Sequence, residues 1–268
     1  MNSYYKFQRE HGLIEEYTDD ATGTAVGKTL TYEENGCIRN TIFLDKFILS
    51  DTKKELSQWS IHLIHHELCH VHDNFMKFNM FGMEFILRKG GNLNRILKIH
   101  AVNIWSEHIA IKLSVLTTSK EHDWKTKYLI DLIKVRKEEF NKAIDLYKEN
   151  NDVKSFYGQI QLITSSLLCA ACTVYGYLHG MEILLDNTEI LKVKTAIKEY
   201  IKETYFDEVW ELLNEQLTRM SISYPYWDDE IEIGKLGDIV LKMWNKMGAY
   251  PVEDSRGELI INLRGKTP

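Results

Sequence analysis

Histidine and glutamate side chains that could hold a metal ion are concentrated in one short stretch of this 268-residue chain. Residues 66–70 read His-Glu-Leu-Cys-His, which matches the pattern H-E-x-x-H. A helix turns by about 100° per residue, so His66 and His70 lie about 40° apart and one turn apart. Two imidazoles at that spacing can bind one zinc ion, and Glu67 can accept a proton from a zinc-bound water. The pattern therefore predicts zinc chemistry with Glu67 as the general base.

The flanking residues predict that this segment is a helix covered on two faces. Apolar residues at spacings of three and four form one stripe, which we expect to face the core: Ile61, Ile64, Leu68, Val71 and Phe75. Other apolar residues fall on the side of the histidines: Leu56, Trp59 and Leu63. A helix packed between a sheet and a helical body shows such a pattern, here with a polar window at His66, Glu67 and His70.

A zinc site of this kind needs a third protein ligand, and Glu107 is the strongest candidate. It lies in the middle of an apolar stripe of a helix expected over residues 92–117. A carboxylate in that position must be paired, protonated or bound to metal. His100 shares the stripe but lies about 10 Å away along the helix axis, so the two cannot easily bind one ion. Glu84, in a less regular stretch, is a further alternative.

Over about residues 30–116, the chain resembles the zincin metallopeptidases of the gluzincin kind. Those proteins place H-E-x-x-H on one helix and a glutamate ligand on a later helix, which here matches His66, Glu67, His70 and Glu107. The segment from Glu107 to Ala110 also resembles the E-x-x-A segment of several intracellular gluzincins.

The pattern departs from related motifs at three positions. The longer metzincin pattern fails, because Asp73 and Met76 stand where its glycine and third ligand would be. Cys69 is a departure from the small residues that the family usually has before the second histidine.

The resemblance implies a fold, a cofactor and a reaction. It implies that His66, His70 and Glu107 hold Zn²⁺, and that Glu67 moves a proton from water to the leaving amine of a cleaved peptide. It implies an edge strand that aligns the peptide, for which residues 37–44 are our candidate. It also implies that a Tyr or His from the helical body stabilises the oxyanion, with Tyr175 and His179 as candidates, although core packing is the simpler interpretation of both.

Several neighbouring residues have simpler interpretations than metal binding. His62 lies on the ligand face one turn before His66, and we expect a supporting donor or a solvated side chain. Asp73 lies one turn beyond His70, where a supporting role and a plain surface position are both open. We expect His65 and His72, which point to other faces, to be structural.

The order of the elements favours an α+β, zincin-like fold with a small N-terminal sheet and a mainly helical body. Asn35-Gly36 between β-forming runs predicts a hairpin over residues 29–44, and Thr52 to Glu55 fits a capping box. We expect a β-rich part over residues 1–50, metal-binding helices over 51–120 and a helical part over 121–268, in one compact unit. Expected helices are 53–76, 92–117, 122–149, 154–184, 189–220 and 235–248, with breaks at Gly90-Gly91 and Asn150-Asn151 and a last strand over 258–263.

Composition narrows the class of protein. A formal net charge of −6 makes tight binding to nucleic acid a poor hypothesis. The four Cys do not form a disulfide framework, and small residues around Cys169 and Cys172 favour close helix packing. Residues 155–181 lack charged side chains, but their Gln, Ser, Thr and Gly favour a buried central helix over a membrane span. With no signal-peptide pattern at the N-terminus, we expect a cytoplasmic protein.

The sequence therefore predicts a zinc-dependent metallopeptidase that acts on a peptide or protein. One alternative is a catalytically silent protein of the same fold that binds a partner protein in a regulatory role. Another is a metal-dependent hydrolase of a non-peptide bond. The shape of the cleft and the metal content would distinguish these three hypotheses. The sequence does not indicate the substrate or the oligomeric state.

Overall fold

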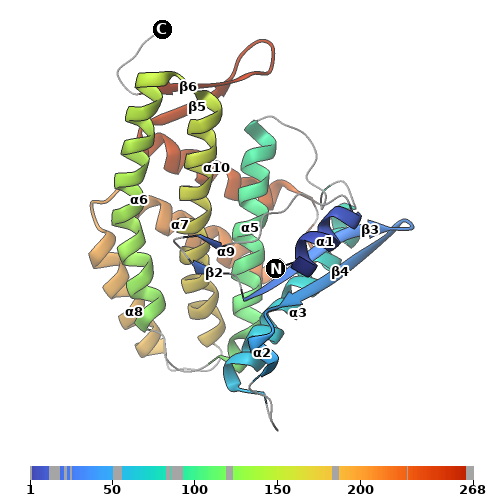
Figure 1. Ribbon diagram of the computed structural model, residues 1–268. Helices are drawn as coiled ribbons and strands as arrows, with labels where there is room; N and C mark the ends of the chain where they lie inside the picture. Colours follow the sequence, from blue (N-terminus) through green and yellow to red (C-terminus); the bar gives the residue numbers. More distant parts are fainter. Residues whose placement is uncertain are drawn as a thin grey trace.

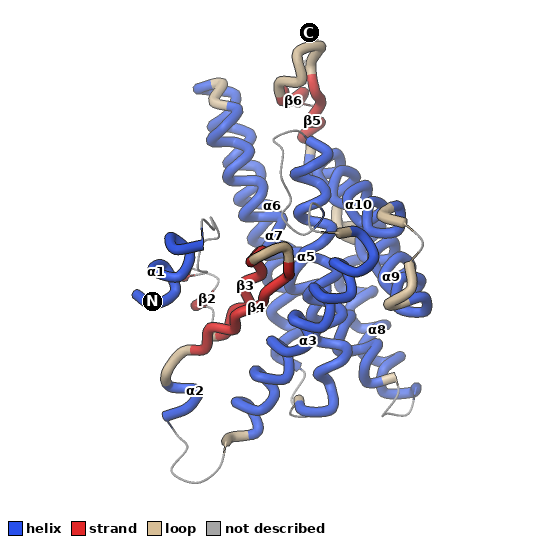
Figure 2. The backbone as a smooth tube through the Cα atoms, turned by 90° about the vertical axis from the view of Figure 1, so that its right-hand side faces the viewer, coloured by secondary structure: helices blue, strands red, loops and turns tan. Residues whose placement is uncertain are grey.

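Helices make up most of the fold, and each of the short strands belongs to a hairpin (Figures 1 and 2). The computed structural model describes residues 2–11, 19–20, 23–24, 26–50, 56–82, 85, 93–118, 123–182, 187–227 and 229–263. Within these residues the mostly helical body and the small antiparallel sheets agree with the expected α+β class.

The expected N-terminal hairpin is confirmed. Strands β3 (Gly27–Glu34) and β4 (Cys37–Leu44) pair antiparallel along their whole length. Asn35 and Gly36 turn between them with φ angles of 53° and 74°, which is the positive-φ pair that a type I′ turn requires. Helix α1 (Asn2–His11) packs its aromatic side chains on one face of the hairpin, which leaves the other face for helix α3. The shorter elements nearby are β1 (Asp19–Asp20), β2 (Gly23–Thr24) and α2 (Phe47–Ser50).

Helix α3 (Gln58–Phe81) carries the H-E-x-x-H residues. Its N-cap is Ser57, whose side chain accepts a hydrogen bond from the backbone N–H of Ser60. It ends at Gly82, which has a φ angle of 78°. The predicted start at residue 53 was therefore wrong. The expected capping box over residues 52–55 lies outside the described residues.

Helix α3 lies between the hairpin and helix α5 (Leu93–Ser114), as expected (Figure 1). The prediction that two apolar faces of α3 are covered was wrong for several residues of each face. Leu68 and Phe75, from the stripe assigned to the core, are 51% and 50% exposed. Trp59, from the second apolar group, is also exposed. The buried residues of α3 are instead mainly polar: Ser60, Glu67, Cys69, Asp73 and Lys77.

The core lies in the helical body, where α5 and α7 (Val153–Met181) run side by side (Figure 1). A Cβ atom on Gly176 would lie 2.5 Å from the carbonyl oxygen of His108, and one on Gly180 would lie 2.8 Å from that of Lys112. Both contacts advance by four residues in the same direction, so the two helices are parallel. The expected close packing on this side of α7 is confirmed at these glycines.

Helix α7 is long and apolar enough to cross a membrane by length and composition. Two thirds of its most apolar window, 67%, is buried inside the protein. That burial is typical of the core helix of a soluble protein and agrees with the expected central position.

The remaining elements follow the expected order, except that one predicted helix is divided and one strand was not predicted. The 3₁₀ turn η1 (Val115–Thr117) precedes α6 (Asp123–Asn150). Asn151, with a φ angle of 55°, separates the end of α6 from the start of α7. A single helix was predicted over residues 189–220, but the chain forms α8 (Asn187–Ile201) and α9 (Asp207–Ser223). Glu203, with a φ angle of 64°, lies in the break between them. The last elements are α10 (Ile231–Met247), β5 (Ala249–Glu253) and β6 (Leu259–Leu263), of which β5 was not predicted.

Candidate metal centre

Three side chains from two helices converge on one point. The Nε2 atoms of His66 and His70 on α3 lie 3.0 Å apart. One carboxylate oxygen of Glu107 on α5 lies 3.8 Å from His66 Nε2, and the other lies 3.6 Å from His70 Nε2. Among the described residues, these three form the one group of His, Cys, Asp and Glu side chains whose ligand atoms lie within 4.8 Å of one another. The structure thus brings together the three residues predicted as metal ligands.

These separations fit a small divalent cation. Zinc binds histidine nitrogen and carboxylate oxygen at about 2.0–2.2 Å, so two ligands at a tetrahedral zinc lie about 3.3–3.5 Å apart. The two Nε2 atoms are 3.0 Å apart and each lies 3.6–3.8 Å from one of the two Glu107 oxygens, and with one ligand atom per residue all three lie within 4.8 Å of one another, so small shifts of the side chains would reach that value. Two imidazoles and one carboxylate are also the protein ligands of many catalytic zinc sites, which leave one position open.

Burial keeps the two imidazoles in the form that binds metal. It lowers the pKa of His66 well below the ordinary value, and the neighbouring His70 and His62 lower that pKa further. Burial also lowers the pKa of His70 to about 4. Both rings are therefore neutral at pH 7, and a neutral imidazole offers the lone pair that a metal needs.

Glu107 is enclosed although 30% of its side chain is accessible. Burial, with a smaller effect of the Glu67 charge, raises the pKa of Glu107 to about 7. Without a cation, this carboxylate is therefore partly protonated at neutral pH. A divalent cation between the three ligand atoms would stabilise the charged form.

Glu67 follows His66 on α3, its charge acts on Glu107, and its side chain is held by strand β3. Its Oε2 atom accepts a 2.7 Å hydrogen bond from the hydroxyl of Thr29. A Cβ atom on Gly27 would lie 2.8 Å from Glu67 Oε1, so the absence of a side chain at residue 27 leaves room for the carboxylate. Burial raises the pKa of Glu67, and the Thr29 hydrogen bond opposes that rise. The strand that touches Glu67 is thus β3, and residues 37–44, our candidate for the strand that aligns a peptide, form its neighbour β4.

His70 is supported by a chain of polar contacts behind its ring. Its Nδ1 atom lies 3.1 Å from the hydroxyl of Ser106, and that hydroxyl donates to a carboxylate oxygen of Asp73 at 3.2 Å. Asp73 also accepts from the indole N–H of Trp105 and pairs with Lys77 at 2.6 Å. Asp73 is fully buried, which excludes the plain surface position that was one of the two left open for it.

The other candidate ligands lie away from the cluster. Nδ1 of His62 and Nδ1 of His65 both contact the Thr117 hydroxyl, at 3.3 and 3.0 Å. His100 is buried against the side chains of Ser165 and Trp244. Glu84 lies outside the described residues.

The two candidates for stabilising an oxyanion, Tyr175 and His179, form contacts within the helical body. Tyr175 donates its hydroxyl to the carbonyl of Trp210. His179 lies between His108 and Asn214, with contacts of 2.9 and 3.1 Å. Neither side chain is free to stabilise an oxyanion at the metal centre, which favours the simpler interpretation of both.

The four cysteines are all free thiols. Burial raises the pKa of Cys69 to about 11, and it raises the pKa values of Cys169 and Cys172 well above the ordinary value. These thiols are protonated at neutral pH, and a protonated thiol is a poor metal ligand.

Sequence reasoning missed Thr29 and Ser106. Each is a small hydroxyl residue in a segment that was otherwise interpreted correctly. The adjacency of Ser106 to Glu107 was the available signal for Ser106, because neighbouring positions on one helix can serve one site. Nothing in the local sequence pairs Thr29 with Glu67, since that contact depends on how the hairpin docks on α3.

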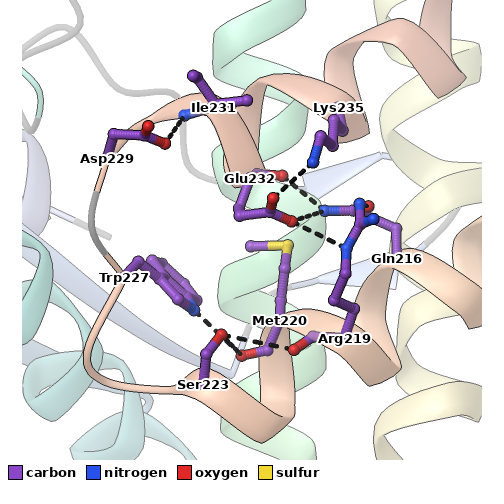
Figure 3. A network of polar contacts seen from close by, with 9 residues as sticks. All are labelled: Gln216, Arg219, Met220, Ser223, Trp227, Asp229, Ile231, Glu232 and Lys235. Carbon is purple, nitrogen blue, oxygen red and sulfur yellow. Dashed lines mark hydrogen bonds and ion pairs between the residues drawn. The ribbon is translucent and has the colours of Figure 1, made fainter.

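A second polar network joins α9 and α10, distant in sequence from the metal ligands (Figure 3). Glu232 there pairs with Arg219 and Lys235 and accepts from Gln216. Some of these residues line a shallow pocket of about 260 Å³, formed by Leu212, Glu215, Gln216, Arg219, Lys235, Asp238, Ile239 and Lys242. Glu232 is already engaged by two cations and an amide, so we interpret the network as a structural contact that holds the two helices together.

Comparisons with known proteins identify no relative for this chain. No family model, curated protein or solved structure matches it. The geometry of the site is therefore the basis on which a function can be assigned to this chain.

Proposed function

We propose that this protein is a zinc-dependent hydrolase of the metallopeptidase class. The observation that carries the proposal is the convergence of His66, His70 and Glu107, with Glu67 held beside them. These are the four residues that the gluzincin resemblance requires: three of them meet from helices α3 and α5, and Glu67 follows His66 on α3.

The ligand set favours zinc among the common metals. Two neutral imidazoles and one carboxylate suit zinc better than the all-oxygen sites of magnesium and calcium. When bound, zinc supplies Lewis-acid chemistry: it polarises a carbonyl group and makes water acidic enough for a carboxylate to take its proton.

Glu67 is the proposed general base. The Thr29 hydroxyl donates to Oε2, and Oε1, which lies against Gly27, is the atom proposed to accept a proton from water and to pass it to the leaving amine. Burial raises the pKa of Glu67, and this brings the carboxylate closer to the proton affinity that a base needs near neutral pH.

Strand β3 is the proposed guide for an extended peptide. It lies against Glu67 through Gly27 and Thr29, and one of its edges pairs with β4. A peptide that adds to the other edge would lie next to the proposed base. This replaces residues 37–44 as the strand that we propose for substrate alignment.

Metal content tests the proposal first. The purified protein should hold about one zinc per chain, and His66→Ala and Glu107→Ala should lose it or bind it far more weakly. His72→Ala is the matched control, because this histidine is on the same helix and contacts Tyr224 instead of the cluster. A wild-type protein that binds no zinc when zinc is supplied would exclude the peptidase.

Activity is the second test. Wild-type protein should cleave members of a mixed peptide library, and Glu67→Gln should lower the rate by at least about 100-fold, the scale of general-base catalysis. The same variant should keep its zinc, because Glu67 is not part of the ligand cluster.

A catalytically silent, partner-binding protein is the second candidate function. The observation in its favour is that Glu67 is only 4% exposed beneath strand β3, so the proposed base is covered. Tight zinc binding with no cleavage of any library peptide would support this candidate over the peptidase.

A further inference from the structure

The two histidines of the cluster have different surroundings behind their rings. Nδ1 of His66 is buried and has no hydrogen-bond partner within the described part of the chain. Nδ1 of His70 instead lies 3.1 Å from the Ser106 hydroxyl. The difference matters because a neutral imidazole carries one proton, on Nδ1 or on Nε2, and only the nitrogen without it can bind a metal.

Proton counting along the polar contacts assigns the tautomer of His70. The Asp73 carboxylate can only accept hydrogen bonds, so the one proton of the Ser106 hydroxyl goes to Asp73. The Ser106 oxygen can then only accept from His70, which places the ring proton on Nδ1. The Nε2 lone pair of His70 is left pointing at His66 and Glu107.

The end of this chain of contacts is held in place. Asp73 has no exposed surface, pairs with Lys77 at 2.6 Å and accepts from the Trp105 indole at 2.9 Å. Trp105 and Ser106 are consecutive residues of α5, and the next residue is Glu107. Asp73 and Lys77 are one turn apart on α3. This chain of polar contacts therefore joins the same two helices that supply the proposed metal ligands.

We infer that Ser106 and Asp73 are positioning residues for the metal centre, which hold His70 as the Nδ1–H tautomer and so keep its Nε2 ready to bind zinc. The inference rests on the metal-binding function proposed above and adds two residues to it. Loss of such a supporting partner typically weakens metal binding by about 10- to 100-fold.

A purely structural role for Ser106 makes a different prediction. If its hydroxyl only ties α5 to α3, its removal changes stability but leaves the tautomer of His70 and the zinc affinity unchanged. The experiment must therefore read the tautomer directly, as well as the affinity.

The test compares Ser106→Ala, Ser106→Thr and Ser114→Ala with the wild type. Ser114 is the matched control, because it is a buried serine of the same helix whose hydroxyl donates to the carbonyl of Ile111. Two-bond proton–nitrogen NMR correlations of the metal-free proteins report which ring nitrogen of His70 carries the proton. Competition with a chelator gives the zinc dissociation constant, and circular dichroism confirms that each variant is folded.

We expect the wild type, Ser106→Thr and Ser114→Ala to show the Nδ1–H form. Ser106→Ala should show a mixture with the Nε2–H form, and its zinc affinity should be about 10- to 100-fold weaker. A folded Ser106→Ala with the wild-type tautomer and affinity would overturn the inference while leaving the proposed function intact. A shift of equal size in Ser106→Thr would also overturn it, because the hydroxyl would then not be the cause. Wild-type protein that binds no zinc would refute the proposed function, and with it the role of this tautomer in metal binding.

Discussion

At the scale of single residues, two carboxylates in one site have surroundings that suit different tasks. Glu107 faces two neutral imidazoles, and burial raises its pKa to about 7. Glu67 faces the hydroxyl of Thr29, which lowers a pKa that burial has raised. The first arrangement suits a ligand that gives up its proton to a cation, and the second suits a base that exchanges protons with water.

The raised pKa of Glu107 predicts a pH dependence of zinc binding. Below pH 7 the metal-free carboxyl is protonated and must release that proton to bind, whereas His70, with a pKa of about 4, is already neutral. Zinc affinity should therefore fall by up to about tenfold per pH unit as the pH drops from 7 to 5, which corresponds to one released proton. Titrations with zinc at several pH values measure this slope.

Glu107→Gln is the control for that slope. It should bind zinc more weakly, with little change in affinity between pH 7 and pH 5, because the group that titrates is gone. A slope of two or three protons in the wild type would mean that the histidines also titrate in this range.

The substitution Thr29→Val is expected to shift the pH profile of catalysis. The hydrogen bond from Thr29 lowers the pKa of Glu67, so its loss should raise that pKa. A base works when deprotonated, so the acidic limb of the kcat/KM profile should move to higher pH. Thr41→Val is the matched control, since the Thr41 hydroxyl contacts Tyr32. An unchanged acidic limb in Thr29→Val would argue against Glu67 as the titrating base.

At the scale of elements, α3 shows where sequence patterns predict well and where they do not. The H-E-x-x-H spacing placed His66 and His70 on one face because that depends only on helical geometry, the apolar stripe singled out Glu107, and the gluzincin resemblance paired the two helices. The same periodicity assigned Leu68 and Phe75 to the core, yet both are half exposed. A stripe of apolar residues marks a face of a helix, but it does not say which face the rest of the fold will cover.

Contacts between elements account for the other differences. The break near Glu203 divides a run of residues that would otherwise continue as one helix, and no Gly or Pro marks it. Thr29 meets Glu67 across a separation of 38 residues, and Ser106 meets Asp73 across 33. Such contacts follow from docking, which the periodicity of one segment does not encode.

The exposure of Leu68 on α3 predicts that its truncation lowers the free energy of unfolding less than truncation of a buried leucine on α7. Leu68→Ala should lower the free energy of unfolding by less than about 1 kcal/mol, because that side chain is half exposed. Leu167→Ala, at a fully buried position of α7, should cost about 2–5 kcal/mol. Urea denaturation measures both. Equal costs would indicate that the apolar face of α3 is covered in solution.

The close approach of α5 and α7 predicts opposite effects of two glycine substitutions on one helix. Gly176→Ala would place a methyl group against the His108 carbonyl and should cost about 1–3 kcal/mol through overpacking. Gly158→Ala, with open space around it, should stabilise the protein by about 0.5–1 kcal/mol. Thermal unfolding of the metal-free variants measures both effects. A neutral Gly176→Ala would contradict the packing described here.

At the scale of the whole molecule, the three proposed metal ligands link the helix next to the hairpin with a helix of the core. His66 and His70 belong to α3, and Glu107 belongs to α5, half of whose residues are buried. An ion held by all three can bind tightly only when these helices are docked. Metal binding should therefore stabilise the folded state as a whole.

Zinc is thus predicted to raise the melting temperature. At a free concentration 100 times the dissociation constant, a ligand specific for the folded state adds about 2.7 kcal/mol to the free energy of unfolding. Thermal denaturation with and without zinc should show this gain in the wild type and lose most of it in Glu107→Ala. Equal melting temperatures in saturating zinc and in chelator would contradict a site that bridges the two helices.

Glu107 and His108 are consecutive, yet they serve opposite sides of α5. Glu107 reaches toward α3, while the His108 carbonyl and ring lie against α7. An inserted or deleted residue earlier in this helix would turn Glu107 by about 100° and would also displace the close contact with Gly176. Length variation over the course of evolution is therefore expected to spare α5 and to accumulate in the turn of the β3–β4 hairpin. The packing of the core therefore fixes the rotational position on α5 of Glu107, the proposed third ligand.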